Sequence, residues 1–248
     1  MKIAAVQMEA KAGRIQNNIE KIHDFVGKNK DADIIIFPEL AVSGYCTGEF
    51  HKFAAEIGKD IYQELAKIAR KHSVYLGCGF LEKENENIYN SYLVFDKAGE
   101  LVAKYRKIHL INEFDKGLTE GNDIIVFETG FGRVGIAICY DLRFPELWRG
   151  LMRRDAEVVF LPSQWPKKRI EHWNVLLKAR AIENQFFVVG ANGAGKSSEG
   201  ETQVISPDGK IISRLNDKES VLKVEIDLKE VNNIREAFPC LEDIREDF

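Results

Sequence analysis

A cysteine placed between an apolar run and a proline is the clearest sign of chemistry in this chain. Cys139 follows Val134–Ile138, a run typical of a buried strand, and Pro145 suits the first turn of a helix. This order predicts a sharp strand-to-helix connection, which exposes a nucleophile and directs free backbone N–H groups at the group it attacks. Positive potential near a helix start would also favour the thiolate. Taken alone, Cys139 is better explained as a buried structural cysteine, because free cysteine is among the most buried residue types.

Charged residues follow two other predicted strands. Glu39 comes after the apolar run Ile34–Phe37 and Pro38, so it is expected at the carboxyl edge of a sheet. A partly desolvated glutamate there can act as a base near neutral pH, although a surface glutamate beginning a loop is the simpler interpretation. The basic segment 103–110, which contains Lys107, by itself indicates only a solvated edge.

Together these segments resemble the signature blocks of the nitrilase (carbon–nitrogen hydrolase) superfamily. The blocks are Pro-Glu-Leu at 38–40, Tyr-Arg-Lys-Ile-His-Leu at 105–110 and Cys-Tyr-Asp-Leu-Arg-Phe-Pro-Glu at 139–146. They stand in the family's order and at its usual separations. The resemblance extends over nearly the whole chain, from Ala-Val-Gln at 5–7 to the segment 173–184. Among family members it is most similar to omega-amidase-type amidohydrolases.

The resemblance implies a role for each matching residue. Glu39 would be the general base, Lys107 the electrostatic stabiliser and Cys139 the nucleophile, with the Tyr140 backbone N–H as a second oxyanion donor. Many relatives carry another glutamate a few residues beyond the lysine, and Glu113 is the nearest match. The loop here has Glu-Gly at 120–121 in place of the usual Pro-Gly, which leaves the register of that second acid open.

The overall composition predicts a soluble globular protein. The chain has 248 residues, 45% of them hydrophobic, and a net charge of -4, which favours neither nucleic acid nor an anionic membrane as a partner. The apolar run at 3–6 is too short for an export signal. The cysteines show no metal-ligand or redox spacing, so we expect a cytoplasmic protein without metal or cofactor. These cysteines are Cys46, Cys78, Cys139 and Cys240. His109 and His172 are interpreted as packing or hydrogen-bonding residues.

Hydrophobic periodicity predicts the elements that position these residues. Three stripes at helical spacing start at Ile15, Ile57 and Ile170. Short apolar runs between them predict strands covered on both faces, and glycine-containing turns at 96–99 and 207–209 predict two hairpins. These elements predict a layered α/β sandwich. The family resemblance implies its form, an α-β-β-α sandwich of the nitrilase type with two mixed sheets and helices outside. We expect one carbon–nitrogen hydrolase domain over residues 1–248.

Several functions remain open at the level of the residues. We expect hydrolysis of a small carboxylate-bearing amide, giving ammonia through a thioester. A nitrilase or N-carbamoyl hydrolase with the same three residues and a catalytically silent binding protein are the alternatives. Arg143 and Arg169 are candidates for binding the carboxylate, and Trp165 for walling the pocket. Otherwise Arg143 would pair with Glu146 or Asp141, and Arg169 would be solvated.

A homodimer or larger homo-oligomer is also expected. Relatives pair their sandwiches across helices, and the helices following Pro145 and Pro166 are the corresponding ones here. Trp148 and Leu151 are expected to be exposed on that surface. The C-terminal tail, about 229–248, is apolar enough in part to contact the partner subunit.

Overall fold

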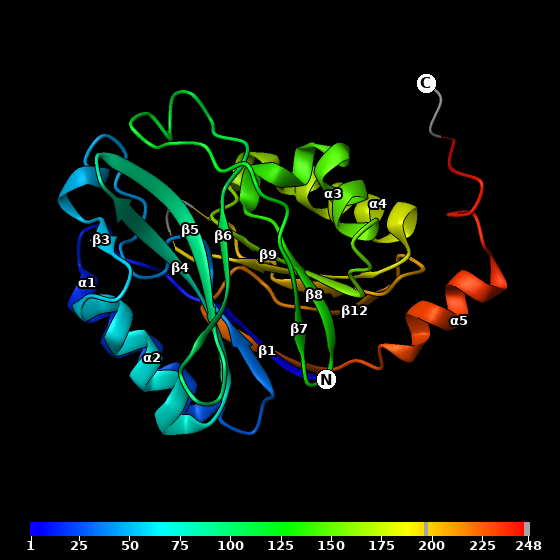
Figure 1. Cartoon of the computed structure of the whole chain (residues 1–248), viewed down its shortest axis with the longest axis horizontal. Helices are drawn as coiled ribbons and strands as arrows, with labels where there is room; N and C mark the ends of the chain where they lie inside the picture. The colour runs from blue at the N-terminus through cyan, green and yellow to red at the C-terminus, as the bar shows by residue number, and fades with distance from the viewer. Residues whose placement is uncertain (196–197, 246–248) are drawn as a thin grey trace.

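Two β-sheets packed face to face form the centre of the molecule, with helices on the outside (Figure 1). The structure is a computed structural model that describes residues 1–195 and 198–245. Within these residues the first sheet has the strand order β13-β1-β2-β4-β5-β6, with β3 paired to β4, and the second has the order β12-β11-β10-β9-β8-β7.

The first sheet is built from strands of both halves of the chain. They are β1 (Lys2–Gln7), β2 (Ile34–Ile36), β3 (Ala55–Glu56), β4 (Tyr75–Glu84), β5 (Asn87–Phe95), β6 (Leu101–Arg106) and β13 (Ser220–Glu225). The second sheet comprises β7 (Val126–Thr129), β8 (Gly132–Ile136), β9 (Val158–Ser163), β10 (Phe187–Asn192), β11 (Gln203–Ile205) and β12 (Ile211–Arg214).

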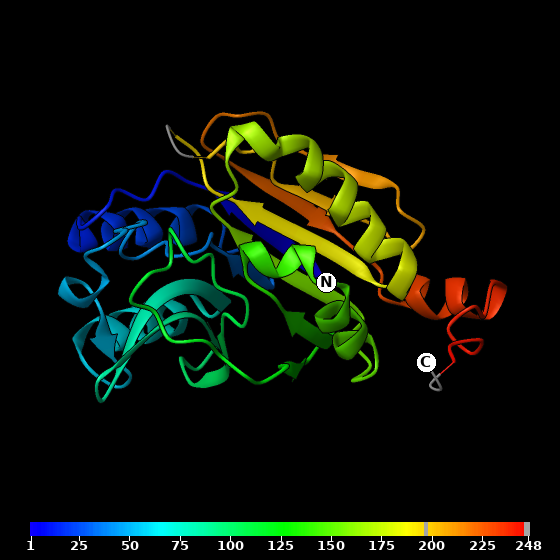
Figure 2. The same cartoon turned by 90° about the horizontal axis from the view of Figure 1, so that it is seen from above.

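Two pairs of helices cover the outer faces. The α-helices are α1 (Ile15–Lys28), α2 (Asp60–His72), α3 (Pro145–Met152), α4 (Ile170–Asn184) and α5 (Lys229–Ala237), and the 3-10 helices are η1 (Phe50–Lys52), η2 (Cys139–Arg143) and η3 (Lys167–Arg169). Helices α1 and α2 lie on the first sheet, α3 and α4 on the second, and α5 projects from the body of the molecule in both views (Figures 1 and 2). No helix of the described residues is both long and apolar enough to cross a membrane.

Alternation along the strands explains the layering. Ile3 and Ala5 of β1 face the core between the sheets, whereas Ala4 and Val6 face the core beneath α1 and α2. Because successive side chains of a strand point to opposite faces, a strand covered on both sides must be apolar at every position. The predicted α-β-β-α sandwich with two mixed sheets is confirmed.

Parallel pairing places the carboxyl ends of neighbouring strands at the same edge of a sheet. β1, β2 and β4 pair in parallel in the first sheet, as do β8, β9 and β10 in the second. Open α/β sheets place their binding sites beyond the carboxyl ends of such strands. The segments that follow β2 and β8 carry Glu39 and Cys139.

One expectation about the surface is wrong. Trp148 and Leu151 are fully buried in their own subunit, where they belong to the core between the sheet and α3. An apolar helical residue can face either its own core or a partner, and here the three-to-four-residue spacing of Leu147, Trp148 and Leu151 faces inward. The exposed apolar side chains of this layer are Val175 and Ile182 of α4, which are 63% and 52% exposed.

Candidate active site

Cys139 stands on a strained elbow between β8 and α3. It is the first residue of η2, and its φ angle is +47°, in the left-handed region that non-glycine residues seldom adopt. Such a conformation costs on the order of 1–3 kcal/mol and persists only where neighbouring contacts maintain it. The predicted strand-to-helix turn is therefore present, with the cysteine at its apex.

Asp141 holds this elbow in place. Its carboxylate is fully buried and accepts hydrogen bonds from the Ile138 backbone N–H at 2.9 Å and from the Tyr105 hydroxyl at 2.7 Å. It also bonds His109 through Nδ1 at 2.8 Å, and the His109 ring stacks on Phe144. His109 is thus a hydrogen-bonding residue that supports the turn.

Glu39 is presented by a tight loop after β2. Pro38 precedes it and Leu40 follows with a φ of +49°. The loop packs so closely on β4 that a Cβ atom at Gly79 would lie 2.2 Å from the Leu40 backbone nitrogen. A glycine is therefore required at position 79 for the loop to occupy this place.

The Glu39 carboxylate is fully buried but well bonded. Oε1 accepts from the Asn90 side chain at 2.8 Å and from Lys107 Nζ at 3.0 Å. Oε2 accepts from the Gln164 backbone N–H at 3.0 Å. A buried charge is tolerated only when it is paired and hydrogen-bonded, and these three donors meet that condition.

Lys107 follows β6 and lies between two carboxylates. Nζ is 3.0 Å from Glu39 Oε1 and 2.9 Å from Asp115 Oδ2, and all three side chains are fully buried. Burial disfavours the charged ammonium, but the negative charges of Glu39 and Asp115 outweigh it and raise the pKa of Lys107 above its usual range. Tyr45 donates a hydrogen bond to Asp115. Lys107 is therefore a fixed cation close to Cys139.

The second acid of the site is Asp115, which corrects the expectation for Glu113. Glu113 is exposed to solvent. Asp115, two residues further on, accepts hydrogen bonds from Lys107 and from the Ile111 backbone N–H. The loop 111–115 turns back on itself, because the Asp115 backbone N–H bonds the Ile111 carbonyl. This turn points one acid inward and the other outward, and the sequence contains no periodicity that distinguishes them.

The expectation that the elbow favours a thiolate is also wrong. Burial, followed by the charge of Glu39, raises the pKa of Cys139 well above its usual value, and Lys107 and the Gln164 backbone N–H only partly offset this. A short 3-10 helix after the cysteine contributes little dipole compared with these effects. The raised pKa favours the neutral thiol, so a nucleophilic role for Cys139 would require a base to take its proton.

Arg143, Arg169 and Trp165 gather beside the elbow. The Arg143 guanidinium lies over the Trp165 ring, 4.8 Å from its centroid, and contacts His172 Nδ1 at 3.2 Å. Within the described residues neither arginine forms an ion pair, so the alternative pairing of Arg143 with Glu146 or Asp141 is not formed. Arg169 is exposed to solvent, as the alternative for that residue expected. Burial and the neighbouring charge of Arg169 lower the pKa of Arg143. Two adjacent cations without an acid are suited to an anionic ligand.

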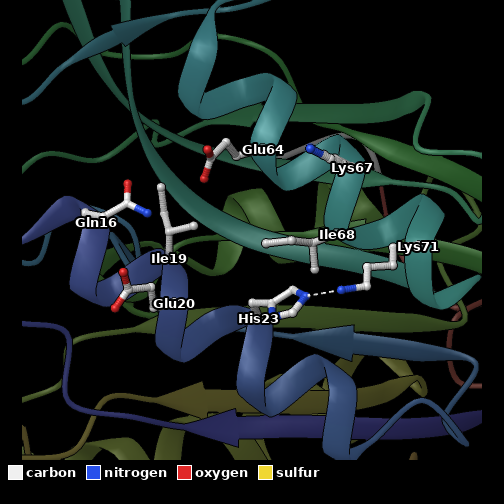
Figure 3. Close-up of a pocket in the computed structure, with 8 residues that line it drawn as sticks. All are labelled: Gln16, Ile19, Glu20, His23, Glu64, Lys67, Ile68 and Lys71. Carbon is white, nitrogen blue, oxygen red and sulfur yellow. Dashed lines mark hydrogen bonds between the residues drawn. The ribbon is translucent and has the colours of Figure 1, made fainter.

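A groove on the surface lies in another region. It has a volume of about 350 Å³ and lies between α1 and α2, where His23 bonds Lys71 (Figure 3). Residues such as Gln16, Glu20 and Glu64 line it, and none belongs to the site described above. No group of three or more potential metal-binding side chains occurs in residues 1–195 and 198–245.

The chain belongs to the carbon–nitrogen hydrolase family, whose model matches residues 2–236. It is an enzyme of the amidase class within the nitrilase superfamily.

Comparison with known proteins shows which amidases the chain is similar to. The chain is 35% identical to a 2-oxoglutaramate amidase of Bacillus subtilis, over 99% of this chain and 98% of that protein. It is 30% identical to the human omega-amidase NIT2, over 99% and 95% of the two chains. The crystal structure of Saccharomyces cerevisiae Nit3, from branch 10 of the nitrilase superfamily, superposes with a TM-score of 0.90 at 27% identity, covering 100% and 97%. The chain is therefore omega-amidase-like.

Proposed function

We propose that Glu39, Lys107 and Cys139 hydrolyse a small amide through a thioester on Cys139. The observation that carries this proposal is the buried Glu39–Lys107 pair at the carboxyl edge of one sheet, facing the strained Cys139 elbow of the other. Burying the charges of Glu39 and Lys107 and straining the backbone at Cys139 are each unfavourable for stability. Buried charges and strained residues of this kind occur mostly at functional sites.

The chemistry requires one base to act several times. As Cys139 Sγ bonds the amide carbon, its proton passes to Glu39 and the carbonyl electron pair moves to oxygen, beside Lys107 and the Tyr140 backbone N–H. The C–N bond then breaks, and ammonia leaves with the proton from Glu39. Water attacks the thioester while Glu39 takes its proton. Breakage of the C–S bond then releases the carboxylic acid and returns the proton to sulfur.

Asp115 would keep Lys107 in position for this reaction. Its carboxylate bonds the ammonium at 2.9 Å in addition to Glu39, and Tyr45 and Ile111 hold the carboxylate in turn. A donor already fixed before the oxyanion forms needs no reorganisation in the transition state. Asp115, rather than Glu113, is thus the second acid in our proposal, and it acts by holding Lys107.

The substrate that we propose carries a carboxylate besides its amide, as the omega-amide of a dicarboxylic or 2-oxo dicarboxylic acid does. Arg143 and Arg169 supply unpaired positive charge next to the nucleophile, and Trp165, 2% exposed, supplies a rigid wall. The names of two relatives, a 2-oxoglutaramate amidase and an omega-amidase, agree with such a substrate. An arginine guanidinium can hold a carboxylate in a fixed orientation by donating two parallel hydrogen bonds.

Ammonia release over a panel of amides, nitriles and N-carbamoyl compounds tests the reaction. The proposal expects release from the carboxylate-bearing amides, and none from Cys139→Ala. Turnover confined to nitriles or carbamoyl compounds would favour the alternative activities, which use the same three residues.

Carboxylate recognition is tested by comparing an acid with its uncharged methyl ester. Wild type should prefer the acid, and Arg169→Ala should lose most of that preference in kcat/KM. Lys168→Ala is a matched control, since Lys168 is an exposed cation of the same short helix. Equal rates on acid and ester in wild type would rule out carboxylate recognition.

We also propose a cytoplasmic homodimer in which residues 1–248 act as one hydrolase domain. Support for the dimer comes from exposed Val175 and Ile182 on α4, from Phe238, which is 68% exposed, and from the projection of α5 (Figure 2). Part of the proposed interface tail, residues 246–248, lies outside the described residues. Four free cysteines support a reducing compartment.

A further inference from the structure

Gln164 contacts Glu39 at two separate points. It follows β9 in the second sheet, and its backbone N–H donates to Glu39 Oε2 at 3.0 Å. Its side-chain Nε2 donates to the Glu39 main-chain carbonyl, also at 3.0 Å. One residue therefore holds both ends of the glutamate, which restricts the side-chain torsions between them.

The Gln164 side chain is itself held in place. Ser198 Oγ donates to Gln164 Oε1 at 2.7 Å, which also identifies the amide oxygen and nitrogen. On the other side, Gly193 leaves room for the amide, because a Cβ atom there would lie 2.3 Å from Gln164 Oε1. The amide is thus bonded through both its oxygen and its nitrogen.

These bonds join the two sheets at the point where base and nucleophile meet. The other donors to the Glu39 carboxylate, Asn90 and Lys107, come from β5 and from the end of β6, in the same sheet as the glutamate's own strand. Cys139 follows β8 and Gln164 follows β9, and both strands belong to the second sheet. The Gln164 backbone N–H also acts on Cys139, where it favours the thiolate and lowers the pKa of the thiol. Gln164 therefore contacts both halves of the site.

We propose that Gln164 is a positioning residue. Its side-chain amide fixes the position of Glu39, which follows a strand of the first sheet, relative to Cys139, which follows a strand of the second. The inference rests on the proposed function, in which Glu39 transfers protons for Cys139. A displaced catalytic group can cost on the order of 10²-fold in rate for a shift of about 1 Å. The side chain of Gln164 acts on Glu39 rather than on the reacting atoms.

Gln164→Met tests the inference, because methionine keeps the length of the side chain and removes its two hydrogen bonds. We expect kcat/KM for the amide to fall by roughly 10–100-fold, and to fall less for a matched p-nitrophenyl ester. Loss of ammonia requires a proton from Glu39, whereas p-nitrophenolate leaves without one. Ser198→Ala, which removes only the support of the amide, should show the same pattern with a smaller loss.

Gln203→Met is the matched control. Gln203 is a fully buried glutamine of β11 whose amide bonds Asn174 Oδ1 at 2.8 Å, away from the site. Its variant should have a comparable change in melting temperature and unchanged kcat/KM. Equal losses on amide and ester in Gln164→Met and Ser198→Ala, or no loss in either, would overturn the inference. Persistent activity in Cys139→Ala would instead refute the proposed function.

Discussion

Replacing Lys107 by methionine should damage stability as well as catalysis. The change preserves much of the side-chain volume but leaves Glu39 and Asp115 buried without their shared cation. The two oxygens that bond Nζ lie within about 6 Å of each other, where two unit charges repel by roughly 3 kcal/mol at an effective dielectric constant of about 20. Removing one partner of a buried ion pair typically costs about 3–5 kcal/mol.

Thermal unfolding and ammonia release measure the two effects separately. For a chain of this size the stability loss corresponds to a melting temperature lower by roughly 6–20 °C. Hydrolysis should fall by about 10²–10³-fold or more, as expected for loss of an oxyanion donor. In the double variant Lys107→Met/Asp115→Asn one charge of the repelling pair is gone, so much of the stability should return. Activity should not return, because the cation is still missing.

Lys223→Met is the matched control. Lys223 Nζ bonds Asp31 at 3.0 Å, the same distance as the Lys107–Glu39 bond, but both side chains are at least half exposed. Exposed ion pairs contribute little, so this variant should melt close to wild type. Two results would show that Glu39, Lys107 and Asp115 do not form the buried charge cluster described above. One is a melting temperature of Lys107→Met no lower than that of the control. The other is a melting temperature of the double variant Lys107→Met/Asp115→Asn no higher than that of Lys107→Met.

Three further predictions concern the nucleophile, the base and the assembly. Cys139→Ala should abolish ammonia release and leave the circular dichroism spectrum unchanged, because the covalent route is removed outright; turnover within about tenfold of wild type would contradict the assignment. Glu39→Gln should lose orders of magnitude in hydrolysis, yet its Cys139 should deprotonate more readily, since the Glu39 charge helps to raise the pKa of that thiol. Alkylation of Cys139 by iodoacetamide, followed by mass spectrometry between about pH 6 and 10, should therefore rise at lower pH in the variant; a rise at the same or higher pH would refute this account of the thiol. Light scattering should give at least twice the chain mass, and a value of 28.2 kDa at micromolar concentration would exclude the dimer.

Much of the fold could be predicted from periodicity. The stripes at Ile15, Ile57 and Ile170 correspond to α1, α2 and α4, although Ile57 precedes α2, which begins at Asp60. The apolar runs and both predicted hairpins are strands in the structure. β13 was not predicted, because its alternation is irregular and its pairing with β1 joins the two ends of the chain. Local patterns contain no information about such a distant partner.

Within the site, residues next to strand ends were easier to predict than residues held by loops. Glu39, Lys107 and Cys139 each stand just after an apolar or hairpin strand, and the structure brings them together. Asp115 and Tyr45 were missed because they lie in loops whose direction depends on tertiary contacts. Gln164 directly precedes Trp165, but no pattern in the sequence singles it out, and only its contacts with Glu39 reveal a role.

The sequence by itself determined the layers of the fold and the chemical types at the strand ends, because alternation and helical spacing dictate which faces must be buried. Only the tertiary structure decided the protonation and partners of those groups. The pKa of Cys139, the position of Lys107 between Glu39 and Asp115 and the proximity of Arg143 to Arg169 all arise from contacts that the local sequence pattern does not specify. Desolvation and Coulomb interactions depend on distances in space, and the order of residues along the chain does not specify those distances.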